Sequence, residues 1–266
     1  MKNKRTWGPK PNYPQVKSYK RPDDKFIIVA GPCSVESCKQ IWDLAGQAAK
    51  MGATHLRGGV FRAGTYPGDN FGLVDESLMR AHKEAAFASG LKNIMEVLDY
   101  SPTSMHLFDK YASCFQIGAR SMQNYTLLKK VSSYGKTIFL KRGIGSTLDE
   151  WLGAAEYILR NNCDVVLIER GSSTFLDHVR WDLSISMIPA VKAITDIPII
   201  VDASHGTGRR DLVEPMTLAG VAAGADGLLC EIHNDPDKSL SDSEQAIKPQ
   251  QLHSILNKVH KIREIL

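Results

Sequence analysis

From residue 26 onward, short apolar runs alternate regularly with helical patterns, and this alternation narrows the possible folds to a few. Apolar runs predict buried strands, and apolar residues spaced by three or four predict helices. The expected strands are 26–30, 54–57, 93–97, 114–117, 137–141, 165–169, 199–202 and 227–231, and the expected helices are 37–50, 75–89, 102–111, 124–133, 147–161, 184–194, 211–223 and 248–264.

Eight strand–helix pairs predict an α/β fold, a single (β/α)8 TIM barrel with a short N-terminal extension. An open doubly wound sheet is the alternative, because the number of strands alone does not prove closure. No Gly-x-Gly-x-x-Gly follows the first strand, which disfavours dinucleotide binding. Capping patterns support two of the helices: Ser101-Pro102, and Ser146-Thr147-Leu148-Asp149-Glu150, in which a hydroxyl is followed three residues later by an acid.

Residues 1–24 have four prolines and little periodicity, which predicts an extended N-terminal arm. A segment of about 24 residues is too short to bury a core of its own. We therefore expect an arm at 1–24 and a catalytic barrel domain at 25–266. Without a separate regulatory domain, we expect no feedback regulation of the kind that such a domain provides.

The amino-acid composition indicates the cellular compartment of the protein and the kind of ligand it binds. Five cysteines without framework spacing predict reduced thiols, and no apolar run approaches the roughly 20 residues of a membrane span, so we expect a cytoplasmic protein without membrane contact. The net charge is +4 and the basic residues form no tract. This favours small anionic ligands over nucleic acid.

Potential metal ligands follow several of the expected strands. His205 lies just past 199–202, and Cys33, Glu231 and Asp242 lie at or near other strand ends. The C-terminal rim of such a barrel carries the active site. A thiolate, an imidazole and two carboxylates suit a divalent manganese, iron, cobalt or zinc ion. Taken singly, Cys33 could instead be a buried apolar residue, His205 a structural residue and Asp242 a helix cap.

Basic residues also follow strands that end at this rim, namely Arg57, Arg120, Lys141 and Arg170. Guanidinium groups bind phosphate and carboxylate through paired hydrogen bonds, and neighbouring glycines allow close approach of a ligand. Each residue alone could simply form a surface ion pair. Four together predict a site for a small polyanion such as a phosphorylated carboxylate.

Several motifs occur in a single order along the chain: Ala-Gly-Pro-Cys-Ser, Leu-Arg-Gly-Gly, Gln-Ile-Gly-Ala-Arg, Leu-Lys-Arg-Gly, Glu-Arg-Gly and Ser-His-x-Thr-Gly-Arg-Arg-Asp. Over roughly residues 25–255 the set resembles 3-deoxy-D-arabino-heptulosonate 7-phosphate (DAHP) synthase, of the short type related to 3-deoxy-octulosonate 8-phosphate synthase. The resemblance implies a metal-dependent, aldol-type condensation of phosphoenolpyruvate with erythrose 4-phosphate. It also implies a place in the shikimate pathway to aromatic amino acids, and a homo-oligomer, a dimer or a tetramer.

The resemblance also assigns roles to individual residues. It implies metal ligands at Cys33, His205, Glu231 and Asp242, and proton transfer by Lys141, Glu96 or His205. It implies substrate binding by Arg57, Arg62, Thr65, Ala119, Arg120, Lys141 and Arg170, with Arg120, Lys141 and Arg170 on the phosphate of phosphoenolpyruvate.

The chain departs from the family in the aldehyde half of the site. Where the family reads Lys-Pro-Arg-Thr-Ser, this chain reads Arg-Ala-Gly-Thr-Tyr over 62–66, and Arg-Trp-Asp-Leu-Ser over 180–184 replaces Arg-Asn-Thr-Leu-Asp. A third change is Asp-Ala-Ser-His in place of Asp-Pro-Ser-His. Two interpretations remain open: Arg62 or a nearby cation holds erythrose 4-phosphate, or the enzyme uses a different aldehyde.

Two other functions fit the sequence less well. A metal-dependent aldolase acting on pyruvate would need no phosphate site, so the basic residues disfavour it. A non-catalytic, anion-binding barrel would not need four potential metal ligands.

Overall fold

The computed structural model describes residues 13–60 and 75–266, so the expected substrate contacts Arg62 and Thr65 lie outside the described residues. Eight parallel strands close into a barrel in chain order, with β8 paired to β1. The strands are β1 (Ile27–Gly31), β2 (His55–Arg57), β3 (Lys92–Glu96), β4 (Cys114–Ile117), β5 (Ile138–Lys141), β6 (Val165–Glu169), β7 (Ile199–Asp202) and β8 (Gly227–Glu231). The closed barrel confirms the expected fold and excludes the open sheet.

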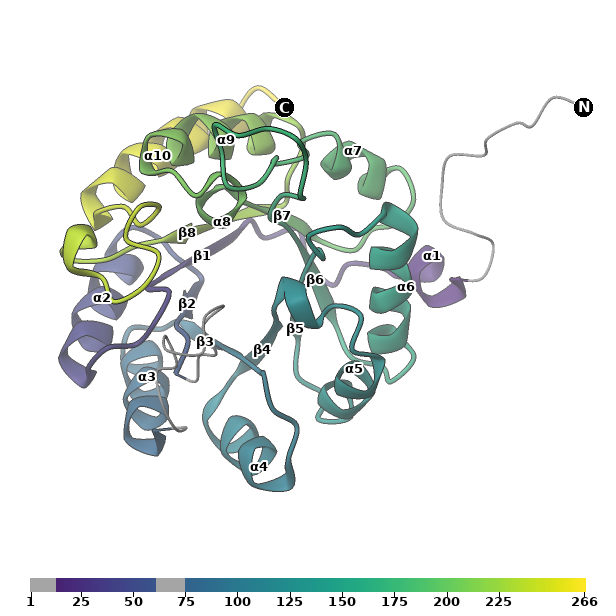
Figure 1. The fold of residues 1–266 in the computed structure, drawn as a ribbon, viewed down its shortest axis with the longest axis horizontal. Helices are drawn as coiled ribbons and strands as arrows, with labels where there is room; N and C mark the ends of the chain where they lie inside the picture. The colour runs from purple at the N-terminus through teal and green to yellow at the C-terminus, as the bar shows by residue number, and fades with distance from the viewer. Residues whose placement is uncertain (1–12, 61–74) are drawn as a thin grey trace, which may run out of the picture.

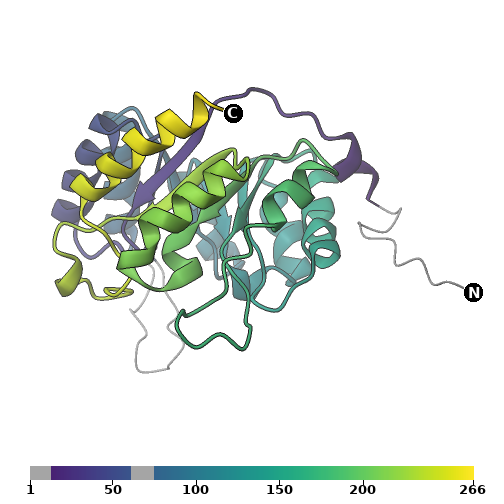
Figure 2. The same ribbon diagram turned by 90° about the horizontal axis from the view of Figure 1, so that it is seen from above.

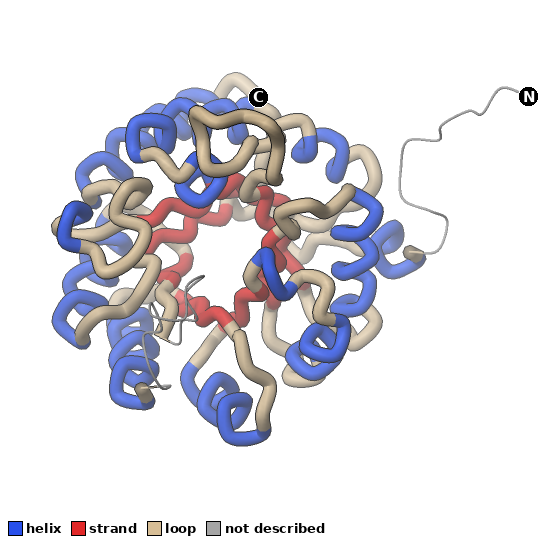
Figure 3. Tube along the Cα trace, in the orientation of Figure 1, coloured by secondary structure: helices blue, strands red, loops and turns tan. Residues whose placement is uncertain are grey.

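Helices surround this ring of strands on all sides (Figure 1 and Figure 3). They are α1 (Pro14–Ser18), α2 (Cys38–Lys50), α3 (Glu76–Ala88), α4 (Pro102–Tyr111), α5 (Tyr125–Ser132), α6 (Leu148–Leu159), α7 (Met187–Lys192), α8 (Ala203–Thr207), α9 (Arg210–Ala222) and α10 (Pro249–Arg263). Short 3₁₀ turns follow β4 and β8, at η2 (Ala119–Ser121) and η3 (Pro236–Lys238). Every expected strand and helix is present, with ends within three residues of the expected ones.

The strands have apolar residues on both faces because one face lines the barrel and the other packs against helices. Val29, Phe139 and Ile200 belong to a small cluster inside the barrel, whereas Ile28 and Ala30 belong to the larger layer under the helices. Closure of the barrel between β8 and β1 also requires a glycine. A Cβ at Gly227 would lie 2.1 Å from the carbonyl oxygen of Ile27, the residue it pairs with on β1.

The expected helix caps are present. The Thr147 hydroxyl accepts a hydrogen bond from the Glu150 amide, and the Glu150 carboxylate accepts one from the Thr147 amide, which forms a capping box at α6. The Ser101 hydroxyl caps α4, with Pro102 in the first turn.

Two short helices were not expected. The arm contains α1, which packs on α6: Val16 is fully buried, and its amide donates to Glu156 Oε2 at 3.0 Å. Residues 19–26, which follow α1, run along one end of the barrel toward β1 (Figure 2). The second helix is α8, in the stretch expected to be a loop after β7. It forms because the Asp202 carboxylate accepts a hydrogen bond from the His205 amide at 3.0 Å.

Among the helices of residues 13–60 and 75–266, none is both long enough and apolar enough to cross a bilayer.

Candidate active site

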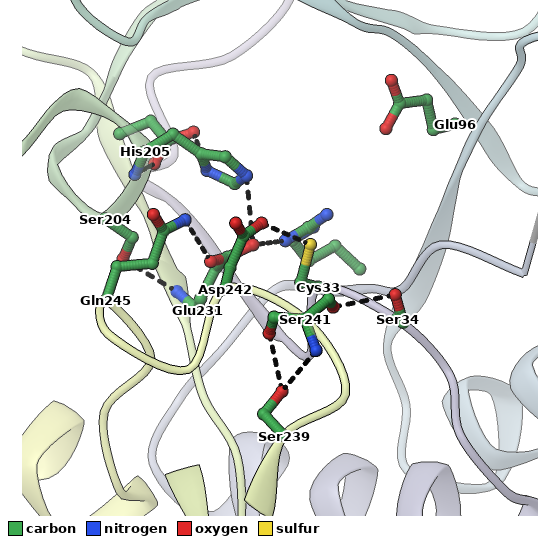
Figure 4. A network of polar contacts seen from close by, with 12 residues as sticks. Cys33, Ser34, Glu96, Ser204, His205, Glu231, Ser239, Ser241, Asp242 and Gln245 are labelled. Atoms are coloured by element: carbon green, nitrogen blue, oxygen red, sulfur yellow. Dashed lines mark hydrogen bonds and ion pairs between the residues drawn. The ribbon is translucent and has the colours of Figure 1, made fainter. Parts of the chain in front are cut away.

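Four potential metal ligands converge at the C-terminal rim of the barrel. Cys33 follows β1, His205 lies in α8 after β7, Glu231 ends β8, and Asp242 lies in the loop between η3 and α10. One ligand atom from each lies within 4.8 Å of the others. Figure 4 shows the four side chains pointing toward one another. The barrel therefore brings together residues that are up to 209 positions apart in the chain.

The donor set and its size fit a divalent ion. Bonds of about 2.0–2.3 Å from a metal to nitrogen, oxygen and sulfur place two ligands at most about 4.6 Å apart. The four atoms already lie close to this size. One sulfur, one imidazole nitrogen and two carboxylate oxygens suit manganese, iron, cobalt or zinc, in agreement with the expected cofactor.

His205 is oriented by carboxylates on both sides of its ring. Its Nδ1 lies 2.8 Å from Asp202 Oδ2, and its Nε2 lies 3.1 Å from Glu231 Oε1. Burial alone would lower the pKa of His205, but the two carboxylates outweigh burial and raise it. A carboxylate on the far nitrogen is the usual support of a metal-binding histidine, because it fixes the tautomer and the ring plane.

Glu231 is fully buried and has several partners. Its Oε1 accepts from Arg57 Nη1 at 2.5 Å and its Oε2 from Gln245 Nε2 at 2.5 Å, while its amide donates to Ser204 Oγ at 3.1 Å. Burial alone would raise the pKa of Glu231, but the neighbouring His205 and Arg57 cations hold it well below its usual range. Arg57, which is expected to bind substrate, forms a buried ion pair with Glu231 in this structure.

Asp242 reaches the cluster from a tightly turned loop. Its φ of +52° lies in the left-handed region, which is uncommon for a residue with a side chain. Cys33 Sγ donates to Asp242 Oδ2 at 2.9 Å, and Arg180 Nη1 donates to Oδ1 at 3.1 Å. A contact of 2.9 Å between the Ser34 and Ser241 hydroxyls joins the same loop to the segment that follows β1 (Figure 4). Neighbouring contacts therefore hold this side chain toward the other ligands.

Lys141 lies beside the four-ligand group. Its Nζ is 3.1 Å from Asp202 Oδ2 and 3.2 Å from His205 Nδ1, and the side chain is 5% exposed. Burial alone would raise the pKa of Asp202, but His205 and Lys141 hold it far below its usual range. An ionised Asp202 can thus support a charged ammonium on Lys141 and a fixed ring on His205.

Arg170 is a buried cation with unused hydrogen-bonding capacity. It is 6% exposed, and its Nε and Nη1 are buried without a hydrogen-bond partner among the described residues. Burial lowers its pKa to about 10; Asp202 acts against this, and the nearby Arg180 and Arg120 add to it. The guanidinium is still charged at neutral pH. A buried cation with unsatisfied N–H groups needs an acceptor, which an anionic ligand can supply.

The remaining expected residues lie around this centre. Glu96 ends β3 and accepts a hydrogen bond from Gln116 Nε2 at 3.2 Å. It lies apart from the four-ligand group in Figure 4. Gly118 gives it room, because a Cβ there would lie 2.1 Å from Glu96 Oε1. Ala119 begins η2, and the side chain of Arg120 is exposed.

Four residues with close contacts in this site were not among the expected ones: Asp202, Gln245, Arg180 and Trp181. The sequence does indicate a role for Asp202, because a carboxylate that ends the apolar run 199–202 needs a charged partner when it is buried. Arg180 and Trp181 lie in one of the segments that depart from the family. Gln245 lies in a loop whose path only the structure reveals.

A sequence model described as the DAHP synthetase I family matches residues 13–266. The chain is 38% identical over 242 residues to the phospho-2-dehydro-3-deoxyheptonate aldolase of Thermotoga maritima, over 91% of this chain and 71% of that protein. It is 27% identical over 262 residues to a 2-dehydro-3-deoxyphosphooctonate aldolase of Desulfotalea psychrophila, over 90% of each.

Solved structures give the same relationship. The crystal structure of the Thermotoga maritima enzyme, a DAHP synthase, matches with a TM-score of 0.86 at 36% identity, over 91% of this chain and 71% of that one. A truncated form of the same synthase matches with a TM-score of 0.83, over 91% and 88%. These findings confirm the resemblance in the motifs, and the chain belongs to the DAHP synthetase I family.

Proposed function

We propose that this enzyme condenses phosphoenolpyruvate with an aldose, giving a 3-deoxy-2-ulosonate and inorganic phosphate. The related proteins support this class of reaction, since their names describe phosphorylated 3-deoxy-2-ulosonates of seven and eight carbons. The observation that carries the proposal is the position of the buried Arg170 next to the four-ligand group. Asp202 and Arg180 each interact with Arg170 and with one member of that group.

The bonds that change define what the site must do. Carbon 3 of phosphoenolpyruvate forms a bond to the aldehyde carbon, whose oxygen takes up a proton. Water adds at carbon 2, and the bond from carbon 2 to the phosphate oxygen breaks. The enzyme must therefore hold a phosphate, deliver one proton and accept another.

The cations supply the first of these functions. In this proposal Arg170 binds the phosphate of phosphoenolpyruvate through its unpartnered Nε–H and Nη1–H groups, and Arg120 adds a second positive charge. Charge-assisted bonds from a planar guanidinium fix both the position and the orientation of a phosphate. Because Arg170 is buried, the same contacts also exclude water from that side of the substrate.

In this proposal Lys141 and Glu96 transfer the protons. Lys141 Nζ, held beside Asp202, can donate a proton to the oxygen that becomes the new hydroxyl. The Glu96 carboxylate can accept a proton from the water that adds at carbon 2. A divalent ion held by Cys33, His205, Glu231 and Asp242 would supply Lewis-acid polarisation of a carbonyl oxygen.

The preference for an aldose is inferred from the sequence alone, because residues 61–74 lie outside the described part of the chain. Gly64 stands where the family has an arginine that binds the phosphate of erythrose 4-phosphate. Loss of that arginine removes a charged hydrogen bond, worth about 1.5–3 kcal/mol. We therefore propose that erythrose 4-phosphate is a poor substrate and that another aldehyde reacts better.

The test is phosphate release from phosphoenolpyruvate with a panel of aldehydes that differ in length and in phosphorylation. We expect release that requires both substrates, and mass spectrometry should find a product three carbons longer than the aldehyde. An Arg170→Ala variant should bind phosphoenolpyruvate about 10–100-fold more weakly. If no aldehyde supports release, or if Arg170→Ala binds as wild type, the proposal is wrong.

A further inference from the structure

Two residues of the β6 strand end and the following loop have buried N–H groups without partners. Arg170 leaves Nε and Nη1 unpaired, and Trp181 leaves its indole Nε1 unpaired, within the described ranges 13–60 and 75–266. The guanidinium carbon of Arg170 lies 5.1 Å from the centre of the Trp181 ring. Native proteins rarely leave buried donors unsatisfied, so three donors on two stacked residues call for a shared explanation.

The loop holds Trp181 against Arg170 by its backbone. Ser172 and Asp182 exchange two amide-to-carbonyl hydrogen bonds, both of 3.0 Å, and so clamp the two ends of the loop together. Gly171 makes the turn with a φ of +87°, and a Cβ there would lie 2.8 Å from the Cβ of Trp181. The hydrogen-bonded turn therefore holds the Trp181 indole next to the Arg170 guanidinium.

The charges around this pair favour an anion. Arg120 and Arg180 lie close enough to disfavour the charged form of Arg170, whereas Asp202 and Glu169 favour it. Both carboxylates have other cationic partners: Asp202 pairs with Lys141 and His205, and Glu169 forms two hydrogen bonds with Arg142. The surroundings of the stacked pair therefore have positive charge that these carboxylates only partly balance.

We propose that Trp181 is a substrate-binding residue that helps Arg170 to hold the phosphate of phosphoenolpyruvate. Its ring face fixes the plane of the Arg170 guanidinium by a cation–π contact, and its Nε1–H donates a hydrogen bond to the same phosphate. This inference rests on the function proposed above and adds a residue to it. A neutral donor suits this position because a further cation would repel Arg120 and Arg170.

The two roles of the indole can be separated by substitution. Trp181→Phe keeps an aromatic face and removes the N–H group, whereas Trp181→Leu removes both. In calorimetric titrations of the zinc-loaded protein, we expect about tenfold weaker binding of phosphoenolpyruvate by Trp181→Phe and still weaker binding by Trp181→Leu. Trp42→Phe is the matched control, because Trp42 is 43% exposed on α2. It should bind as wild type.

A spectroscopic measurement reports on the donor itself. In the ¹⁵N–¹H spectrum of the zinc-loaded wild type, the indole signal that Trp181→Phe removes should move downfield when phosphoenolpyruvate is added, because its proton gains an oxygen acceptor. In steady-state assays Trp181→Phe should raise KM for phosphoenolpyruvate with little change in kcat. A residue that only stabilises the loop would not move the indole signal in this way.

The outcomes separate this inference from the proposed function. If Arg170→Ala weakens phosphoenolpyruvate binding and Trp181→Phe does not, the role of Trp181 is wrong and the phosphate site stands. An indole signal that stays in place while phosphoenolpyruvate binds would also overturn the role of Trp181. If Arg170→Ala has no effect on binding, the proposed phosphate site itself is wrong.

Discussion

At the scale of single residues, the site is held together by buried charges that share partners. Asp202 contacts both Lys141 and His205, and Glu231 contacts both His205 and Arg57. Removing one member of such a set leaves another buried charge without its partner, which costs more than the loss of one hydrogen bond. A substitution at one of these charged residues should therefore also disturb the residues that share its partners.

Cys33 allows a substitution that tests the metal ligands without removing a buried charge pair. Cys33→Ala should lower the metal content of the purified protein and abolish phosphate release, because the thiolate is the proposed ligand. The circular dichroism spectrum should stay that of the wild type. Cys38→Ala, at an exposed cysteine nearby in the chain, is the control and should retain metal. A fully active Cys33→Ala protein would rule out this ligand.

The choice of aldehyde is also decided by single residues. Gly64→Arg should increase kcat/KM for erythrose 4-phosphate, by about tenfold or more if the new guanidinium reaches its phosphate. Gly46→Arg adds the same charge on α2 and should leave this value unchanged. If the wild type already uses erythrose 4-phosphate with a kcat/KM of about 10⁴ M⁻¹s⁻¹ or more, the proposal of a different aldehyde is wrong.

At the scale of elements, the strand ends were predictable and the loops were not. Runs such as 165–169 and 199–202 are apolar on both faces, which is a strong signal, and parallel strands bring their ends to one rim. His205 and Glu231 could therefore be expected in one site. The helical turn of α8 and the path of the loop carrying Asp242 depend on contacts between distant segments. Trp181 lies against Arg170 in a loop whose ends are joined by two backbone hydrogen bonds between Ser172 and Asp182.

The packing of α3 on β2 predicts a dependence of stability on pH. His82 is fully buried and donates from Nε2 to the Leu56 carbonyl oxygen at 3.2 Å, and burial lowers its pKa from 6.5 to about 4. In the unfolded chain the His82 imidazole takes up a proton below about pH 6.5, whereas in the folded protein it stays neutral down to about pH 4. The free energy of unfolding is therefore unaffected by His82 above pH 6.5. It decreases between pH 6.5 and pH 4, by about 1–3 kcal/mol from this residue.

Urea unfolding at pH 7 and at pH 5 measures this effect. His82→Gln keeps a side-chain N–H donor but cannot titrate, so its free energy of unfolding should fall less than that of the wild type. His106→Gln, at an exposed position of α4, should show the wild-type difference. An unchanged difference in His82→Gln would contradict the assigned role of His82.

At the scale of the whole molecule, barrel closure assembles the site. The pairing of β8 with β1 brings Glu231 beside Gly31 and so brings Cys33 toward Glu231 and Asp242. Neither half of the chain contains all four proposed ligands. The match to the DAHP synthetase I family covers residues 13–266 and so includes the whole described barrel with all four proposed ligands.

We also predict that the chain forms a homo-oligomer. Phe87 is 86% exposed and Phe175 is 96% exposed, and burial of such side chains between subunits would be favourable. Light scattering should give a mass of two or four chains of 29.4 kDa. A monomer at micromolar concentration would contradict the prediction.

In the proposed function, the four-ligand group and the buried cation Arg170 form one catalytic site. A titration of chelated protein with Mn²⁺ tests this, with bound metal and phosphate release from phosphoenolpyruvate measured in the same samples in the presence of a reactive aldehyde. We predict that both rise together and level off at about one ion per chain, and that Arg170→Ala binds the ion normally but releases phosphate slowly at low phosphoenolpyruvate concentration. Full activity in the chelated sample, before any metal is added, would show that the four-ligand group is not part of the catalytic site.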